Sequence, residues 1–335
     1  MSKSSPPRGR HTTRLVVGIL TGVVLLVVVG LVAATSYVAT VSQTVSKNLT
    51  RSQQLPPDVP ADPTEAPRPV KEPAAASAVN YVLMGSDSLT GDASQGRSDV
   101  LMVMHLAADR QSAALISFPR DLYVPIPGHG RNKINAAFAL GGTPLTVRTL
   151  ESLLGTRMDH VALLDFTGFI NLTEELGGVT VDNPHASVSQ GYDFPVGSIT
   201  ISGDEALAYV RERKQLPRGD LDRAERQRLV TQAVLKKGLS KETLRNPVAF
   251  NRFTKGLAQQ MTVDDELTIS ELQKTALSIR FRPDDIDSLQ SPVQGVDTSP
   301  SGQSIVVVDA EKTEELASAL RTDQLSEYIA NHPEG

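Results

Sequence analysis

The feature that most constrains this chain is a run of 20 residues without a charged side chain, residues 15–34, near the N-terminus. A helix of about 20 apolar residues spans the roughly 30 Å hydrocarbon core of a bilayer. A cleaved signal peptide is the alternative, with small residues at 32–34 as the cleavage site, but secretory apolar segments usually run to about 7–15 residues. We therefore expect an uncleaved transmembrane signal-anchor helix over residues 15–37.

The charges on the two sides of this run predict its orientation. Residues 1–14 carry four basic and no acidic residue, whereas residues 15–335 carry 29 basic against 38 acidic residues. Because basic residues stay on the cytoplasmic side, we expect a single-pass protein of the cell membrane with residues 1–14 in the cytoplasm and everything after the span outside.

The same composition excludes several classes of protein. A net charge of -9 over residues 15–335 leaves no broad positive footprint for nucleic acid, so no nucleic-acid partner is expected. The absence of cysteine excludes disulfide scaffolds, thiolate metal sites and cysteine nucleophiles. The six histidines show no metal-ligand spacing, and no Gly-x-Ser-x-Gly elbow is present.

Changes in composition divide the rest of the chain into segments. Residues 38–78 hold seven of the 21 prolines between positions 56 and 73, and proline blocks both helices and sheet ladders. We expect this segment to be an extended, partly disordered extracytoplasmic stalk. Residues 79–245 should form the catalytic core, and residues 246–335 should complete the same domain with further helices and a strand.

Apolar periodicity predicts the elements of the folded part. Strands are expected at residues 79–85, 100–107, 113–118, 161–165, 179–182 and 304–309. Helices are expected at residues 143–154, 169–176, 202–212, 220–237, 247–260, 269–280 and 311–322. Thr143 should cap the first of these helices, and Ser202 with Glu205 should form a capping box on the third. Strands interleaved with helices predict an α/β layered domain with a central mixed β-sheet flanked by helices on both faces.

Aspartate and arginine side chains gather at the predicted strand ends. Asp87 follows the first strand and Asp99 precedes the second, so an antiparallel hairpin would bring both carboxylates to one end of the sheet. Arg97 lies beside Asp99, and Arg120 and Asp121 follow the third strand. Taken singly, these are ordinary turn residues. Together, two carboxylates without a histidine suit a hard cation, most simply Mg²⁺.

A second cluster is basic. Residues 211–228 carry six arginines and one lysine, and an arginine fork grips phosphate oxygens bidentately. We expect Arg211, Arg213 and Arg223 to bind an anion, with Arg211 and Arg213 aiming the same way where their helix unwinds. Asp220, Arg223 and Gln227 share one helix face by their spacing. Arg226 and Arg228 are instead expected on a solvated face, with an ion pair between Asp222 and Arg226.

These motifs, in this order, resemble the LytR-CpsA-Psr family of bacterial cell-envelope proteins, over residues 79–240. The motifs are Asn80-Tyr-Val-Leu-Met-Gly-Ser-Asp87, Arg97-Ser-Asp99, Ile116-Ser-Phe-Pro-Arg120-Asp121, Lys133-Ile-Asn135, Leu164-Asp165-Phe166, Ser202-Gly-Asp-Glu-Ala-Leu-Ala-Tyr-Val-Arg211-Glu-Arg213 and Asp220-Leu-Asp-Arg223-Ala-Glu-Arg226-Gln227. One departure is Leu221-Asp222, where members often have Phe-Gly.

The resemblance implies a transferase that moves a glycan phosphate, of the teichoic acid, capsule or arabinogalactan type, from a polyprenyl-pyrophosphate carrier to peptidoglycan. By position, Asp87 and Asp99 would hold Mg²⁺, with Mn²⁺ as the alternative metal. Asp220 and Gln227 would orient the arginines, and Lys133 would line the rim. The pyrophosphate oxygens would be bound by Arg97, Arg120, Arg211, Arg213 and Arg223.

Several points stay open at the level of sequence. The acceptor hydroxyl needs a base, for which Asp121 and Asp220 are both candidates. The carrier lipid needs an apolar slot, for which residues 134–154 are the candidate lining. The alternatives to a transferase are a pyrophosphate hydrolase at the same site, or a non-catalytic envelope-binding or regulatory protein.

Overall fold

The computed structural model describes residues 43–59, 66–86 and 98–332. No helix within these residues combines the length and the apolar character that crossing a bilayer requires. The predicted anchor, residues 15–37, lies outside the described residues.

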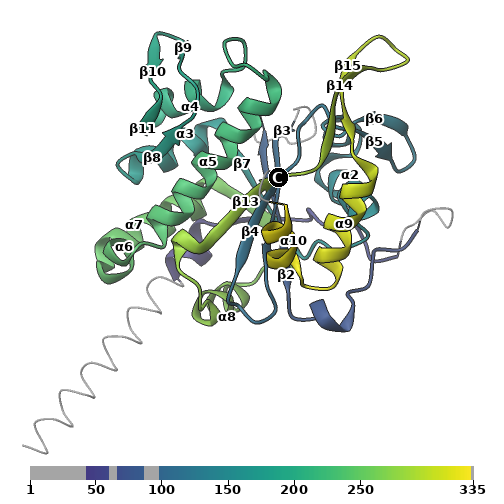
Figure 1. Cartoon of the computed structure of the whole chain (residues 1–335). Coiled ribbons are helices and arrows are strands. Elements are labelled where there is room, and N and C mark those ends of the chain that lie inside the picture. Colours follow the sequence, from purple (N-terminus) through teal and green to yellow (C-terminus); the bar gives the residue numbers. More distant parts are fainter. Residues whose placement is uncertain (1–42, 60–65, 87–97, 333–335) are drawn as a thin grey trace, which may run out of the picture.

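A seven-stranded mixed sheet forms the centre of the domain (Figure 1). Its order is β1-β12-β7-β2-β3-β4-β13. The strands are β1 (Thr50–Ser52), β12 (Met261–Asp264), β7 (His160–Asp165), β2 (Val79–Ser86), β3 (Ser98–Leu106), β4 (Ala113–Ser117) and β13 (Ile286–Gln290). The pairs β2–β3 and β3–β4 are antiparallel, whereas β2–β7 and β4–β13 are parallel.

Alternation of side chains along the central strands gives the sheet two apolar faces. Val82 and Val103 belong to the larger core, which α2 (Ala136–Leu154), α9 (Ala310–Arg321) and α10 (Leu325–Asn331) cover. On the other side of the sheet in Figure 1 lie α3 (Phe166–Glu175), α4 (Gly203–Arg211), α5 (Asp220–Gly238), α6 (Lys241–Arg245) and α7 (Pro247–Gln260). The expected layered α/β architecture is therefore confirmed.

Four two-stranded antiparallel sheets extend from these layers. They are β5 (Tyr123–Ile126) with β6 (Gly130–Lys133), β8 (Val179–Asn183) with β11 (Gly197–Ile201), β9 (Ser187–Ser189) with β10 (Tyr192–Phe194), and β14 (Val293–Thr298) with β15 (Ser304–Val308). The remaining elements are α8 (Ile269–Ser278) and two short 3₁₀ helices, η1 (Pro73–Ala75) and η2 (Pro283–Asp285).

Two predicted helix caps are wrong in their chemistry. Helix α2 is interrupted at Gly141 and Gly142, whose backbone angles are not helical. Its second helical stretch therefore begins near Thr143, as expected. The Thr143 hydroxyl, however, is buried without a hydrogen bond in the described part of the chain. Ser202 is the N-cap of α4, but its side chain accepts no capping bond. The amide of the next residue, Gly203, donates to the Thr173 hydroxyl (2.9 Å).

The described parts of the predicted stalk are not a free spacer. β1 pairs in parallel with β12 at the edge of the sheet. Arg68 is buried and donates to both carboxylate oxygens of Glu151 on α2, at 2.8–3.1 Å. Burial of apolar and paired charged side chains outweighs the proline-rich composition here, so the segment packs against the domain.

Candidate active site

The centre of the site is a contact between two strand ends. Asp99 lies at the start of β3, and Arg120 follows β4, which runs antiparallel to β3. The Asp99 carboxylate accepts a hydrogen bond from Arg120 Nη1 at 2.6 Å. Both side chains are mostly buried, at 18% and 17% exposure. The structure thus brings together two of the residues that the sequence singled out.

Asp220 links this pair to helix α5. Its Oδ1 lies 3.4 Å from Arg120 Nε and 2.5 Å from Arg223 Nη2. Gly219, just before α5, has a φ of 56°, a conformation that glycine adopts without steric cost, and it turns the chain into the helix. Asp220 therefore sits between two guanidinium groups at the N-terminus of α5, as expected of a residue that orients arginines.

The two arginines differ in their electrostatics. Burial disfavours the charge of Arg120, but Asp220, Asp99 and Asp121 outweigh it and raise the pKa of that guanidinium. Burial lowers the pKa of Arg223, and Asp220 only partly offsets it. Arg120 and Arg213 lower the pKa of Arg223 further, because like charges lie close by. An anionic ligand would relieve this repulsion.

Lys133 and Asp121 form a second charged pair. Lys133 ends β6, and its Nζ lies 3.1 Å from Asp121 Oδ1. Asp121 also contributes to the pKa of Arg120, so this pair borders the first. Lys133 and Asp121 are therefore part of the same cluster.

Helix α4 ends at Arg211, and the next residue, Glu212, is extended (φ −65°, ψ 135°). This unwinding is the one that the spacing of Arg211 and Arg213 predicted, and both side chains are exposed. The Arg211 guanidinium lies over the ring of Phe166 at 4.9 Å.

Gln227 does not orient an arginine in the way that was expected. Its amide donates to the carbonyl of Val210 (3.2 Å) rather than to an arginine side chain of the described residues.

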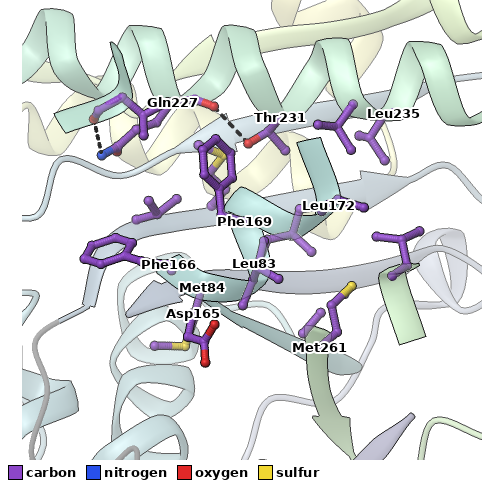
Figure 2. A pocket seen from close by; sticks show the side chains of 18 residues that line it. Leu83, Met84, Asp165, Phe166, Phe169, Leu172, Gln227, Thr231, Leu235 and Met261 are labelled. Carbon is purple, nitrogen blue, oxygen red and sulfur yellow. Dashed lines mark hydrogen bonds between the residues drawn. The ribbon is translucent and has the colours of Figure 1, made fainter. Parts of the chain in front are cut away.

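Beside the charged cluster lies an apolar cavity of about 180 Å³ (Figure 2). Leu83 and Met84 of β2, Phe166, Phe169 and Leu172 of α3, and Gln227, Thr231 and Leu235 of α5 line it. Phe166 thus lines the cavity and also contacts the Arg211 guanidinium.

The slot predicted along residues 134–154 is wrong. The cavity lies against the other face of the sheet, and no residue of 134–154 lines it. Ile134, Phe138 and Leu150 are fully buried in the larger core, where α2 packs on the sheet. Apolar periodicity showed that this segment is buried but not what fills the space beside it.

Arg226 and Arg228 do not form a solvated face. Arg226 is 1% exposed, donates to Asn183 Oδ1 (3.1 Å) and to the His185 carbonyl (2.7 Å), and stacks over Tyr209. Arg228 donates to the Ser117 hydroxyl at 3.0 Å. The expected ion pair between Asp222 and Arg226 is wrong as well.

Asp222 instead pairs with Arg218, whose Nε lies 2.6 Å from Asp222 Oδ1. Asp222, His185 and Glu225 have their ligand atoms within 4.8 Å of one another, which is metal-like spacing. Arg218 already pairs with both carboxylates, since its Nη2 lies 2.5 Å from Glu225. Both carboxylates of this group are therefore already paired with an arginine.

Two predicted residues, Asp87 and Arg97, lie outside the described residues. Ser86, the last residue of β2, pairs with Ser98 at the start of β3, so the expected antiparallel hairpin is confirmed. For a metal, the described part offers the carboxylate of Asp99 and that of Asp220, whose Oδ2 is buried and accepts no hydrogen bond from the described residues. Hard carboxylate oxygens beside arginines fit a divalent cation that is held together with a phosphorylated ligand.

This fold and site define an α/β protein with a cluster of paired arginine, lysine and aspartate side chains at one end of a mixed sheet, next to an apolar cavity. The sequence profile of the LytR_cpsA_psr family matches residues 35–322. The chain belongs to the LytR-CpsA-Psr family, as its motifs predicted.

Named relatives agree with this assignment. The chain is 35% identical over 246 residues to the polyisoprenyl-teichoic acid–peptidoglycan teichoic acid transferase TagU of Bacillus anthracis, covering 73% of this chain and 78% of that protein. The crystal structure of B. subtilis TagV superposes with a TM-score of 0.64 at 27% identity, over 74% of this chain and 97% of TagV. The structure of TagT bound to LI-WTA gives 0.59 at 28% identity, over 77% of this chain and 96% of TagT.

Proposed function

We propose that this chain transfers a glycan phosphate, of the teichoic acid, capsule or arabinogalactan type, from a polyprenyl-pyrophosphate carrier to a hydroxyl of peptidoglycan. The observation that carries the proposal is the position of Phe166 between a charged side chain and the apolar cavity. Its ring lines the apolar cavity and also lies under the Arg211 guanidinium. A ligand with a pyrophosphate joined to a hydrocarbon chain has the same two parts.

The charged part of the site suits the pyrophosphate. Arg120 and Arg223 are held by Asp99 and Asp220 before any ligand arrives, so little reorganisation is needed when an anion binds. Arg97, Arg211 and Arg213 would add further donors, with Lys133 at the rim. Phosphoryl transfer depends mainly on such positioning and charge neutralisation, and needs no covalent nucleophile from the protein.

The apolar cavity suits the first part of the carrier lipid. A cavity of about 180 Å³ lined almost wholly by Leu, Met, Phe and Val side chains is larger than the roughly 150 Å³ cavities that hold a benzene molecule. It therefore takes the isoprene units next to the pyrophosphate, and the rest of the chain lies outside it.

The reaction joins the acceptor to the glycan-bearing phosphate. The acceptor hydroxyl oxygen bonds to the phosphorus that carries the glycan, and its proton passes to a carboxylate. The bond from that phosphorus to the bridging oxygen breaks, and the polyprenyl phosphate leaves with the electron pair. Arg120 and Arg223 stabilise the charge that develops on the leaving group.

Asp87 and Asp99 would hold Mg²⁺ on the pyrophosphate, with Mn²⁺ as the alternative. The cation supplies further neutralisation of the phosphate oxygens when bound. The protein is proposed to be anchored in the cell membrane by residues 15–37 with the domain outside, which places the site on the side where peptidoglycan is found.

The test is an assay with a lipid-linked glycan donor, with and without purified peptidoglycan. A transferase releases polyprenyl phosphate mainly when the acceptor is present, and the glycan becomes bound to peptidoglycan. Equal release of polyprenyl phosphate without acceptor would identify a hydrolase. Pyrophosphate binding without release of product in either assay would identify a non-catalytic binding protein.

A further inference from the structure

Helices α6 and α7 carry basic side chains that have no acidic partner among the described residues. Residues 236–255 contain six basic residues and one acidic residue, in a chain whose overall net charge is -5. Four of the six are exposed and form no ion pair within the described part of the chain: Lys241, Arg245, Arg252 and Lys255. This part of the surface is therefore positive on a domain that is acidic as a whole.

The residues of α7 are arranged in a stripe. Val248, Arg252, Lys255 and Gln259 follow one another at spacings of four, three and four residues, so they share one helix face, and all four are exposed. On the opposite face Phe253 is buried in the core beneath the helix. Helix α7 is thus amphipathic, and its outer face combines positive charge with an apolar side chain, Val248, that is 67% exposed.

This stripe lies beside the segment that leads in from the N-terminus. Gln259 Nε2 donates to Asn48 Oδ1 at 3.1 Å, and Lys47 next to it is exposed and without an ion pair in the described part. In Figure 1 the purple residues that begin the described chain lie against α7, whereas the β14–β15 hairpin lies at the far end of the molecule. Asn48 is ten or so residues beyond the predicted span.

We propose that this surface, defined as Lys47, Lys241, Arg245, Arg252, Lys255 and Val248 and called the α6–α7 basic face, binds anionic phospholipid headgroups of the membrane. The proposal rests on the membrane anchoring in the proposed function. Each basic side chain near an anionic lipid surface strengthens binding by roughly five-fold at physiological salt. Val248 adds an apolar side chain at the level of the headgroups.

Acidic residues nearby offset the positive charge of the α6–α7 basic face only in part. Glu242 is the one acidic residue on α6 and is exposed. Glu175 of α3 packs against Gly256 on the inner side of α7, away from the stripe. Five basic residues therefore face outward against one acidic residue.

The position of the face has a consequence for the donor. Leu257, one turn along α7 from Phe253, lines the apolar cavity. A helix that lies on the membrane with its outer face and lines the cavity with its inner face holds the cavity at the bilayer surface. A carrier lipid can then enter it without leaving the membrane.

The test uses the full chain reconstituted into vesicles, with one cysteine as a probe. Because the chain has no cysteine, Val248→Cys gives a single site for an environment-sensitive fluorophore. Val296→Cys on the β14–β15 hairpin, 65% exposed, is the matched control. We expect the Val248→Cys label to shift to the blue in vesicles with phosphatidylglycerol but not in phosphatidylcholine alone, and to lose the shift at 1 M salt, where the screening length falls to about 3 Å. The Val296→Cys label should not respond.

Charge removal tests the face itself. In the Val248→Cys background, Arg252→Gln with Lys255→Gln should lower the ratio of docked to undocked domain by roughly 25-fold. Arg131→Gln with Lys312→Gln removes the same charge from exposed residues elsewhere and should leave the ratio unchanged. An equal response in neutral and anionic vesicles would overturn the proposal. So would a response to soluble polyphosphate without one to vesicles, since it would assign the face to an anionic polymer. These signals do not depend on transfer, so a failed transferase assay leaves them readable.

Discussion

The Asp99 carboxylate holds the Arg120 guanidinium at 2.6 Å, although 20 residues separate them in the chain. The contact exists because β3 begins where the antiparallel strand β4 ends, so both residues reach the same end of the sheet. Arg120 is therefore fixed in place by the sheet itself, and Asp220 fixes it from a helix on the other side. This double restraint underlies the first predictions.

Replacing Arg120 by lysine should nearly abolish transfer. Lysine keeps the positive charge but loses the planar fork that reaches Asp99 and Asp220 together. We expect kcat/KM to fall roughly 100-fold or more, in line with the loss of one donor to a developing charge. Arg131→Lys, at an exposed residue of the β5–β6 hairpin, is the control and should transfer normally. Normal transfer by Arg120→Lys would exclude the assigned role.

Asp99→Ala should weaken binding of pyrophosphate in the presence of Mg²⁺, because it removes a carboxylate proposed to hold the metal and frees Arg120. Isothermal titration with inorganic pyrophosphate, with and without Mg²⁺, measures the effect. The wild-type chain should bind more tightly with Mg²⁺ and lose transfer in EDTA, and the variant should show little difference between the two titrations. Metal-independent transfer by the wild type would contradict the metal assignment.

Variants of the two candidate bases, Asp121 and Asp220, should differ in whether kcat or KM changes. Asp220 contacts two guanidinium groups, so Asp220→Asn should raise the KM for the lipid-linked donor by loosening Arg120 and Arg223. Among the described residues Asp121 forms an ion pair with one cation, Lys133. We expect Asp121→Asn to lower kcat roughly 100-fold with little change in KM, as the loss of a base would. The reverse pattern would make Asp220 the base.

Filling the apolar cavity should block long donors selectively. Thr231 lines the cavity from α5, and Thr231→Phe places a ring in it. The KM for a polyprenyl-linked donor should rise at least about ten-fold, while the affinity for inorganic pyrophosphate, which needs only the charged cluster, stays the same. If both ligands bind as well as before, the cavity does not hold the lipid.

We expect the protonation of Asp264 to lower the stability of the fold in acid. Burial alone would raise the pKa of this carboxyl, but hydrogen bonds from His160, the Val161 amide and the Leu267 amide outweigh burial and hold its pKa below the ordinary 3.8. A depressed pKa in the folded state adds stability above pH 3.8, and this stability is lost as the pH falls through the folded value.

Urea unfolding at pH 7 and at pH 3 measures this effect. The wild type should lose free energy of unfolding between the two. Asp264→Asn should be less stable at pH 7 by roughly 1–3 kcal/mol, because one of the two backbone donors then faces an amide NH2 in place of a carboxylate oxygen. The variant should also show a smaller difference between the two pH values. An unchanged pH difference would show that other groups carry the acid sensitivity.

Most of the central fold was predictable because it is encoded locally. The apolar runs of β2, β3, β4 and β7 and the helix periods of α4, α5 and α7 lie within two or three residues of their predicted bounds. The antiparallel pairing of β2 with β3 is the arrangement that was expected to bring two strand-end aspartates to one end of the sheet. Among the two-stranded sheets, only β8 and β15 were predicted, at residues 179–182 and 304–309. Most of the strands that were not predicted, β12 and β13 among them, have three to five residues, which carry too little periodicity.

The site was predictable where it depends on strand and helix ends, and unpredictable where it depends on distant partners. Arg226 is the clearest case: its spacing from Asp222 suggested an ion pair, but its partners are Asn183 and the His185 carbonyl, some 40 residues away. The predicted cap at Ser202 is also absent, and the neighbouring Gly203 amide donates to Thr173, 30 residues away. The local sequence limits which partners a side chain can bind, and tertiary contacts determine which of them it binds.

The parallel pairing of β4 with β13 has a consequence for how the protein is made. All five residues of β4 are buried, and its outer edge is covered by Ile286–Gln290, far along the chain. Until that stretch has been synthesised, β4 exposes unpaired backbone groups and an apolar edge, which is the kind of edge that recruits strands from other chains. The β4–β13 pairing is thus a late folding event that must close a long loop. The nascent chain therefore needs protection from aggregation until nearly its whole length has been synthesised.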